Sequence, residues 1–145
     1  MLREPFRTGE VCESNSAKRA NMTLNDLLIT PTPHTPQVSF SPNGEMLIRG
    51  RSIPEDGGLF YEDLMDWVEA YKQNPAINTV FVIDMEYLND ISTKYILMII
   101  RDLNNVCDHF LVKWIYESDD ADMLELGQLM SSSSGCSFEY IEKLV

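Results

Sequence analysis

Residues 79–85 read TVFVIDM, a continuous run of side chains that favour β-strands and are almost all apolar. Such a run predicts a central strand covered on one or both faces, because a half-exposed strand alternates apolar and polar residues. The following residues predict a helix over 91–106, apolar over much of its circumference, and another strand over 109–116. This order favours two parallel strands joined by a helical crossover.

The segments before this unit extend the alternation of strands and helices. Residues 24–29 are short and apolar, and residues 37–40 and 45–50 flank the turn sequence Pro42-Asn43-Gly44, which predicts a β-hairpin. Between residues 60 and 71, apolar side chains recur with the spacing of one helical stripe. We therefore expect a hairpin followed by a first helix.

The segments after the unit continue the pattern to the end of the chain. Acidic residues from Asp119 open a predicted third helix through Met130, since negative groups favour a helix N-terminus. The serine-rich residues 131–135 are expected to form a loop, and residues 136–141 a last strand. The whole order predicts an α/β fold: a single small domain with a mostly parallel sheet of four or five strands, an N-terminal hairpin and about three helices.

The charge of the chain restricts its partners. The 145 residues include 11 basic and 23 acidic side chains, which give a net charge of −12. Residues 1–36 hold four basic and four acidic side chains, so the whole net charge lies in the remainder. Such a surface repels phosphates, and we expect no nucleic-acid partner.

The N-terminal residues differ in character from the rest. Residues 1–22 lack any periodic apolar pattern and are expected to form a disordered extension, which leaves residues 23–145 as the domain. No apolar run approaches the ~20 residues of a membrane-spanning helix, and no secretory signal is recognisable. We expect a cytoplasmic protein without membrane insertion.

The sequence carries no recognisable catalytic or metal-binding motif. His34 and His109 lie far apart, and the three cysteines, Cys12, Cys107 and Cys136, also lack the spacing of metal ligands. No glycine-rich phosphate-binding motif is present. We expect no catalytic residue, no metal and no cofactor.

One enzymatic alternative stays open. Asp84 and Glu86 at the end of the central strand, together with Asp90, could bind magnesium and act as acid and base. Carboxylates exposed to water at a strand end are the simpler interpretation.

The most informative segment is residues 89–94, between the central strand and the apolar helix. Asn89, Asp90, Ser92 and Thr93 can cap the free N–H groups of the helix. The same geometry can receive an anion, because several N–H groups and the positive end of the helix dipole point outward. Composition favours simple capping, but a phosphorylated hydroxyl would also be accommodated here.

Several separated motifs in the right order resemble the SiaC family of bacterial regulatory phosphoproteins. The resemblance covers residues 24–143 and rests on residues 27–38 (LLITPTPHTPQV), residues 50–55 (GRSIPE), Phe60-Tyr61, Trp67-Val68 and Tyr87-Leu88-Asn89 with Ser92 and Lys94. It implies an α/β fold similar to anti-sigma-factor antagonists of the STAS type.

The resemblance also implies a non-enzymatic switch in biofilm signalling. Family members are phosphorylated at the start of the helix after the central strand, by a serine/threonine kinase with a histidine-kinase-like fold. A metal-dependent serine/threonine phosphatase reverses the modification. The unphosphorylated form binds and activates a GGDEF diguanylate cyclase, which makes cyclic di-GMP.

The chain departs from the family at the acceptor position. The family motif reads Leu-Asn-Thr-Ser-Ser, whereas this chain has Asp90 in place of the phosphorylated threonine. Asp90 could fix a phosphorylated-like state, although its charge is smaller than that of a phosphate. Alternatively Ser92, or less readily Thr93, is the acceptor, or Asp90 only caps the helix in a member without kinase control. We favour Ser92 as the acceptor.

The predicted helix over 91–106 has an apolar core face and a candidate partner surface. We expect Asn89, Lys94, Tyr95 and Met98 to contact a partner beside the switch, and the acidic surface to favour a partner rich in Lys or Arg. A partner switch of the anti-sigma-antagonist type is an alternative to cyclase regulation. Ile96, Ile99, Ile100 and Leu103 are predicted to lie in the core.

Overall fold

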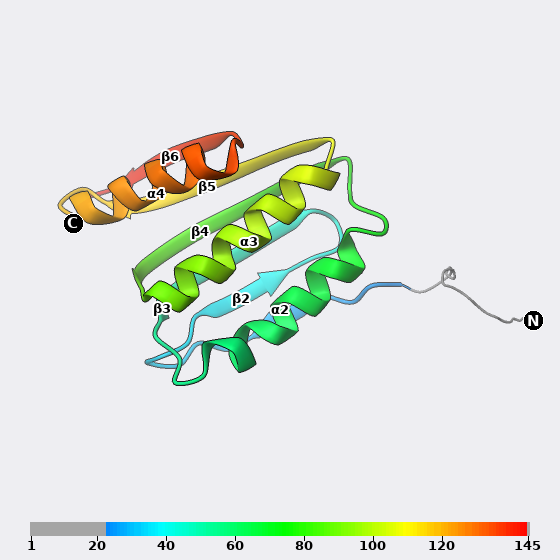
Figure 1. The fold of residues 1–145 in the computed structure, drawn as a ribbon, viewed down its shortest axis with the longest axis horizontal. Helices are drawn as coiled ribbons and strands as arrows, with labels where there is room; N and C mark the ends of the chain where they lie inside the picture. Colours follow the sequence, from blue (N-terminus) through cyan, green and yellow to red (C-terminus); the bar gives the residue numbers. More distant parts are fainter. Residues whose placement is uncertain (1–22, 145) are drawn as a thin grey trace, which may run out of the picture.

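A computed structural model describes residues 23–144 of the chain. These residues form a six-stranded sheet whose spatial order follows the sequence, β1 to β6 (Figure 1). The strands are β1 (Leu27–Ile29), β2 (Gln37–Phe40), β3 (Glu45–Ser52), β4 (Asn78–Leu88), β5 (His109–Glu117) and β6 (Phe138–Lys143). The extension predicted for residues 1–22 lies outside the described residues.

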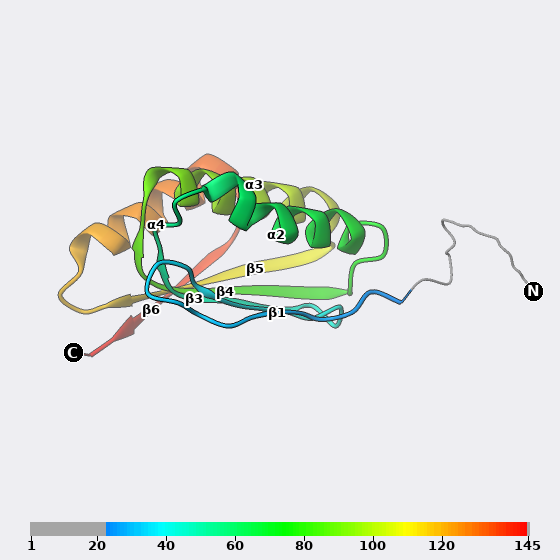
Figure 2. The ribbon, with the colours of Figure 1, turned by 90° about the horizontal axis from the view of Figure 1, so that it is seen from below.

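Three helices connect the parallel strands and lie on one side of the sheet (Figure 2). They are α2 (Gly57–Tyr71), α3 (Asp90–Val106) and α4 (Ala121–Ser134). Each helix begins with a capping residue whose side chain accepts a backbone N–H from the first turn. The capping residues are Asp56 for α2, Asn89 for α3 and Asp120 for α4. Among residues 23–144, no helix is long and apolar enough to cross a bilayer.

The sheet confirms the predicted α/β fold. β1, β2 and β3 pair antiparallel, and β3 to β6 pair parallel. The sheet has six strands instead of four or five. The additional pairing comes from β1, whose three residues are too few to show a strand pattern and are ordered by their pairing with β2.

The predicted loop over residues 131–135 is wrong, because α4 continues through Ser134. The hydroxyls of Ser132 and Ser134 bond to carbonyls three or four residues earlier in the same helix. Gly135 then ends the helix with a left-handed φ of 70°.

The core lies between the helices and the near face of the sheet. Phe81 and Ile83 of β4 are fully buried there. The four α3 residues predicted for the core, Ile96, Ile99, Ile100 and Leu103, are also 0% exposed, which confirms that prediction. Trp114 of β5 packs closely under α4, where a Cβ at Gly127 would lie 2.6 Å from the indole ring.

Candidate functional site

The junction between β4 and α3 is a capped helix N-terminus. The Asn89 side-chain oxygen accepts the Ser92 N–H at 2.9 Å. The Asn89 carbonyl accepts both the backbone N–H of Thr93 at 2.9 Å and its hydroxyl at 3.0 Å. Of the four capping candidates in the sequence, Asn89 is the one that caps α3, and the Thr93 hydroxyl is engaged within the same turn.

Ser92 lies inside the protein, in a chain of three hydroxyl groups. Its side chain is 0% exposed, and its Oγ lies 2.6 Å from the Ser52 Oγ and 3.1 Å from the Ser52 carbonyl. The Ser52 Oγ lies 2.7 Å from the Tyr61 hydroxyl. The triad links the end of β3, the second turn of α2 and the first turn of α3.

One arrangement of protons satisfies the whole triad. Tyr61 donates to Ser52, Ser52 donates to Ser92, and Ser92 donates to the Ser52 carbonyl. Burial raises the pKa of Tyr61, and the hydrogen bonds with Ser52 and Ser92 oppose that rise. Each hydroxyl is thus held as a neutral, paired group in the interior.

The burial of Ser92 conflicts with its predicted role as phosphoacceptor. A kinase must contact the accepting oxygen, and this oxygen is enclosed and already hydrogen-bonded. Transfer to Ser92 would require the first turn of α3 to open and would place a doubly charged group in the core. Thr93 is half-buried and its hydroxyl is bonded to Asn89.

Asp90 is the accessible negative group of the junction. It is exposed and is the first residue of α3, where its carboxylate faces the positive end of the helix dipole. Asp90 is therefore the negative side chain that the start of α3 presents to solvent.

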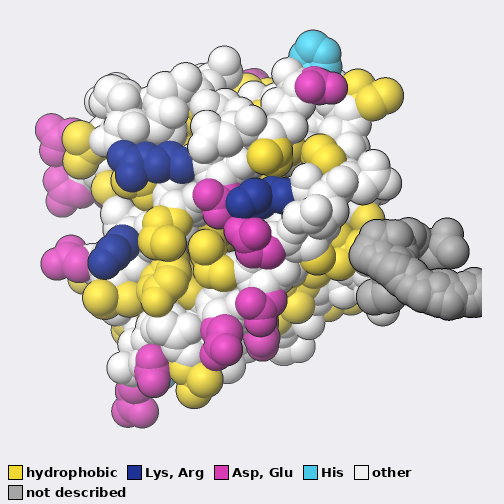
Figure 3. Space-filling view, turned by 45° about the vertical axis from the view of Figure 1, so that its right-hand side comes forward, with side chains coloured by type: hydrophobic (Ala, Val, Ile, Leu, Met, Phe, Trp, Pro, Cys, Tyr) yellow, Lys and Arg dark blue, Asp and Glu magenta, His cyan; other side chains and the backbone are white. Residues whose placement is uncertain are grey.

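A groove of about 540 Å³ adjoins Asp90, between the N-termini of α2 and α3. The lining residues come from both helices and from the turn before α2: Glu55, Asp56, Gly57, Gly58, Ile91, Lys94, Tyr95 and Met98. Ile91 and Met98 are 48% and 38% exposed, respectively. On the helix side of the molecule, hydrophobic side chains lie in the open among acidic and basic ones (Figure 3). The groove thus combines apolar side chains that a partner can contact with charged side chains around them.

The predicted contact residues fall into two sets. Lys94, Tyr95 and Met98 line the groove together. Asn89 does not line it, because its side chain caps α3. Tyr95 is held against Tyr61 by ring stacking, with centroids 5.2 Å apart and planes inclined by 5°.

Sequence reasoning missed the residues that bring the two helices together. A Cβ at Gly57 would lie 2.4 Å from the Ile91 Cγ2, so only glycine allows this approach of α2 to α3. The Gly57-Gly58 pair is the sequence signal for this close approach, but the pair alone does not indicate that Gly57 faces α3. Ile91 was missed as a surface residue because it lies within an apolar helix.

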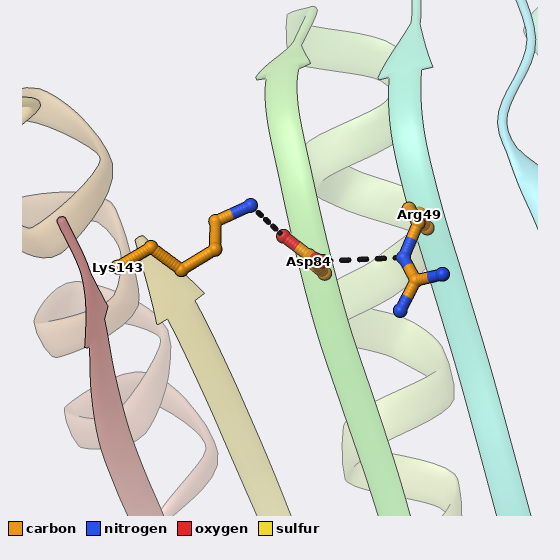
Figure 4. A network of polar contacts seen from close by, with 3 residues as sticks. All are labelled: Arg49, Asp84 and Lys143. Atoms are coloured by element: carbon orange, nitrogen blue, oxygen red, sulfur yellow. Dashed lines mark hydrogen bonds and ion pairs between the residues drawn. The ribbon is translucent and has the colours of Figure 1, made fainter. Parts of the chain in front are cut away.

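The three carboxylates of the enzymatic alternative do not meet: Asp84 and Glu86 line one small pocket, and Asp90 is not among its lining residues. Asp84 lies on the far face of the sheet, between Arg49 at 3.2 Å and Lys143 at 2.9 Å (Figure 4). Glu86 lies 4.0 Å from Arg51, and Asp90 is in α3. Within residues 23–144, no group of three or more His, Cys, Asp or Glu side chains is arranged to hold a metal ion.

Comparisons with known proteins agree with the resemblance seen in the sequence. Residues 29–143 match the family described as SiaC family regulatory phosphoprotein. SiaC of Pseudomonas aeruginosa has a similar structure, with a TM-score of 0.69 and 23% identity over 83% of this chain and 98% of that one. The curated proteins give no match.

Two further solved structures show the same fold. One is the diguanylate cyclase SiaD in complex with its activator SiaC from Pseudomonas aeruginosa, with a TM-score of 0.71 and 22% identity over 83% of this chain and 100% of the matched one. The other is apo-SiaC from the same organism, with a TM-score of 0.67 and 24% identity over 81% and 98%.

Proposed function

This chain belongs to the SiaC family of regulatory phosphoproteins, and we propose that it is a non-enzymatic cytoplasmic adaptor that binds and regulates a GGDEF diguanylate cyclase. The Pseudomonas aeruginosa SiaC with which it shares its fold is an activator of the cyclase SiaD. The partner surface is the groove between the N-termini of α2 and α3, with Lys94, Tyr95 and Met98 as contact residues.

The observation that carries this proposal is the exposed Asp90 beside a groove with two exposed apolar side chains. Ile91 and Met98 provide apolar area, and Asp90 provides a charge that the partner can recognise. The acidic lining residues Glu55 and Asp56 add to the negative charge around Asp90. A cyclase surface that carries Lys or Arg fits this combination.

We infer that Asp90 carries a permanent single negative charge, smaller than that of a phosphate, that leaves the chain in the cyclase-binding state of the unphosphorylated form, and that Ser92 is structural. The burial of Ser92 in the hydroxyl triad and the engaged hydroxyl of Thr93 support this inference. The kinase and phosphatase that the resemblance implies as partners would then find no acceptor on this chain, and its binding to the cyclase would be independent of ATP. Asn89 contributes by holding the first turn of α3 in place.

Binding of the cognate cyclase tests the role of Asp90. The cyclase is recovered by co-purification from the native cell, and its affinity for the full chain is measured by calorimetry. Asp90→Asn should weaken binding by about tenfold, the loss of one charge-assisted hydrogen bond. Asp66→Asn is the matched control, since it removes the same charge from an exposed site in the third turn of α2.

The salt dependence of association provides an independent check. Raising the ionic strength from about 50 to about 300 mM should slow association of the wild-type chain, and Asp90→Asn should reduce that dependence. Equal affinities for Asp90→Asn and Asp66→Asn would reject the proposed site. Recovery of an anti-sigma-type kinase instead of a cyclase would reject the proposed partner.

A further inference from the structure

The face of the sheet opposite the helices is not covered by any helix within residues 23–144 (Figure 2). Six of its side chains are apolar and half-buried, and they come from four neighbouring strands: Leu47, Val80, Val82, Leu111, Ile115 and Ile141. The strand register places Val82 beside Leu47, Val80 beside Leu111, and Ile115 beside Ile141. We call this surface the open face.

The open face differs from the rest of the protein in charge. It holds four basic side chains, Arg49, Arg51, Lys113 and Lys143, and five acidic ones, Glu45, Asp84, Glu86, Glu117 and Glu139, a net of −1. Elsewhere, residues 23–144 hold three basic and fifteen acidic side chains, a net of −12. Nearly all the excess charge therefore lies on the helix side and at the edges of the sheet.

The charges on the open face are also paired locally. Asp84 lies between Arg49 and Lys143, and Arg51 lies near Glu86 and over the ring of Tyr87. Lys113 is the register neighbour of Glu139. The face thus intersperses half-buried apolar side chains with charges that are partly paired within each copy, so few of them would be buried without a partner.

We propose that the open face is the interface of a homodimer, in which two copies of this chain stack their sheets face to face. The distribution of charge favours a second copy of this chain as the occupant of the open face. Two copies that approach through the helix sides bring together two surfaces of strong like charge, whereas two open faces meet with almost no net repulsion. A strongly basic partner would instead prefer the helix side.

The size of the open face suits a dimer. The six strands contain 41 residues, and at about 3.3 Å per residue and about 4.8 Å between strands the face covers about 650 Å², which approaches the roughly 800 Å² per partner of a standard interface. Two sheets pack with their strands within about 30° of each other, at about 10 Å separation. The contact is isologous, so each apolar side chain is buried in both copies.

The dimer leaves the groove beside Asp90 free, because that groove opens on the helix side of each copy. The proposal is independent of the proposed function, and the two can fail separately.

Sedimentation equilibrium of the full chain tests the dimer. At about 100 µM, above the micromolar Kd expected of a standard interface, the mass should be that of two chains. Val82→Arg puts an unpaired charge at the centre of the interface in each copy and should raise the dimer Kd at least about 100-fold. Leu129→Arg in α4, where the native side chain is 62% exposed on the helix side, is the control and should leave the Kd unchanged.

A milder variant keeps the test decisive if Val82→Arg fails to fold. Val82→Thr keeps the shape and the strand preference of valine and should raise the dimer Kd about tenfold. Circular dichroism verifies the fold of each variant. A full chain that stays monomeric at about 100 µM would overturn the proposal, and so would a dimer whose Kd is the same in the Val82 variants and in Leu129→Arg.

Discussion

Replacing Ser92 by alanine isolates the contribution of the buried hydroxyl triad. The variant removes the group that accepts from the Ser52 hydroxyl and leaves that hydroxyl buried without its acceptor. The Ser52 carbonyl loses the Ser92 donor but keeps the Asn89 N–H at 3.1 Å. One buried polar group is therefore unsatisfied, which costs about 1–3 kcal/mol.

Urea denaturation of the full chain measures this cost. At about 4 °C per kcal/mol, the same loss appears as a melting temperature lower by roughly 4–12 °C. Ser133→Ala is the matched control, because it removes an exposed serine hydroxyl within α4 and should change stability by less than about 0.5 kcal/mol. Tyr61→Phe combined with Ser92→Ala should be non-additive, since both hydroxyls contact Ser52.

The stability of Ser92→Ala also bears on regulation. If Ser92→Ala were as stable as Ser133→Ala, the Ser92 hydroxyl would not be committed to the interior, and its exclusion as an acceptor would be refuted.

Three further predictions concern packing and pH. Gly57→Ala should destabilise the protein by about 1–3 kcal/mol in urea denaturation, because the new methyl group would lie 2.4 Å from the Ile91 side chain. Gly127→Ala should be at least as costly in the same assay, since its methyl group meets the rigid indole of Trp114 at 2.6 Å. Burial raises the pKa of Tyr61, so the unfolded chain loses this proton first; stability should be independent of this group below pH ~10 and fall as pH rises above it. Tyr61→Phe should reduce that alkaline loss in melts between neutral and alkaline pH, and an unchanged slope would contradict the burial of the phenol.

Local patterns were sufficient to predict most of the fold. The apolar run over residues 79–85 marks β4, a central strand with β3 and β5 at its two edges. Its Phe81 and Ile83 are buried under the helices, and Val80 and Val82 are half-buried on the open face.

Capping by residues 89–93 could be predicted because it depends on the next few residues alone, but the sequence left four candidates, of which Asn89 is the cap. The prediction of a loop for the serine run was wrong. The serine hydroxyls donate to carbonyls of the preceding helical turn, and composition alone does not predict these hydrogen bonds.

The candidate site was predictable only in part, because its decisive contacts join distant segments. Ser92 meets Ser52 across 40 positions of sequence, and nothing local distinguishes a buried serine from an accessible one at a helix start. The groove depends on the approach of Gly57 to Ile91, which is set by how α2 and α3 pack on the sheet. The position of Asp90, in contrast, followed directly from the motif.

Intact mass spectrometry after incubation with the cognate kinase and ATP tests most directly whether a fixed charge at Asp90 replaces phosphorylation. The wild-type chain should keep its mass, and Asp90→Thr should gain one phosphoryl group at the substituted position. A phosphoryl group on Ser92 or Thr93 of the wild-type chain would contradict the account.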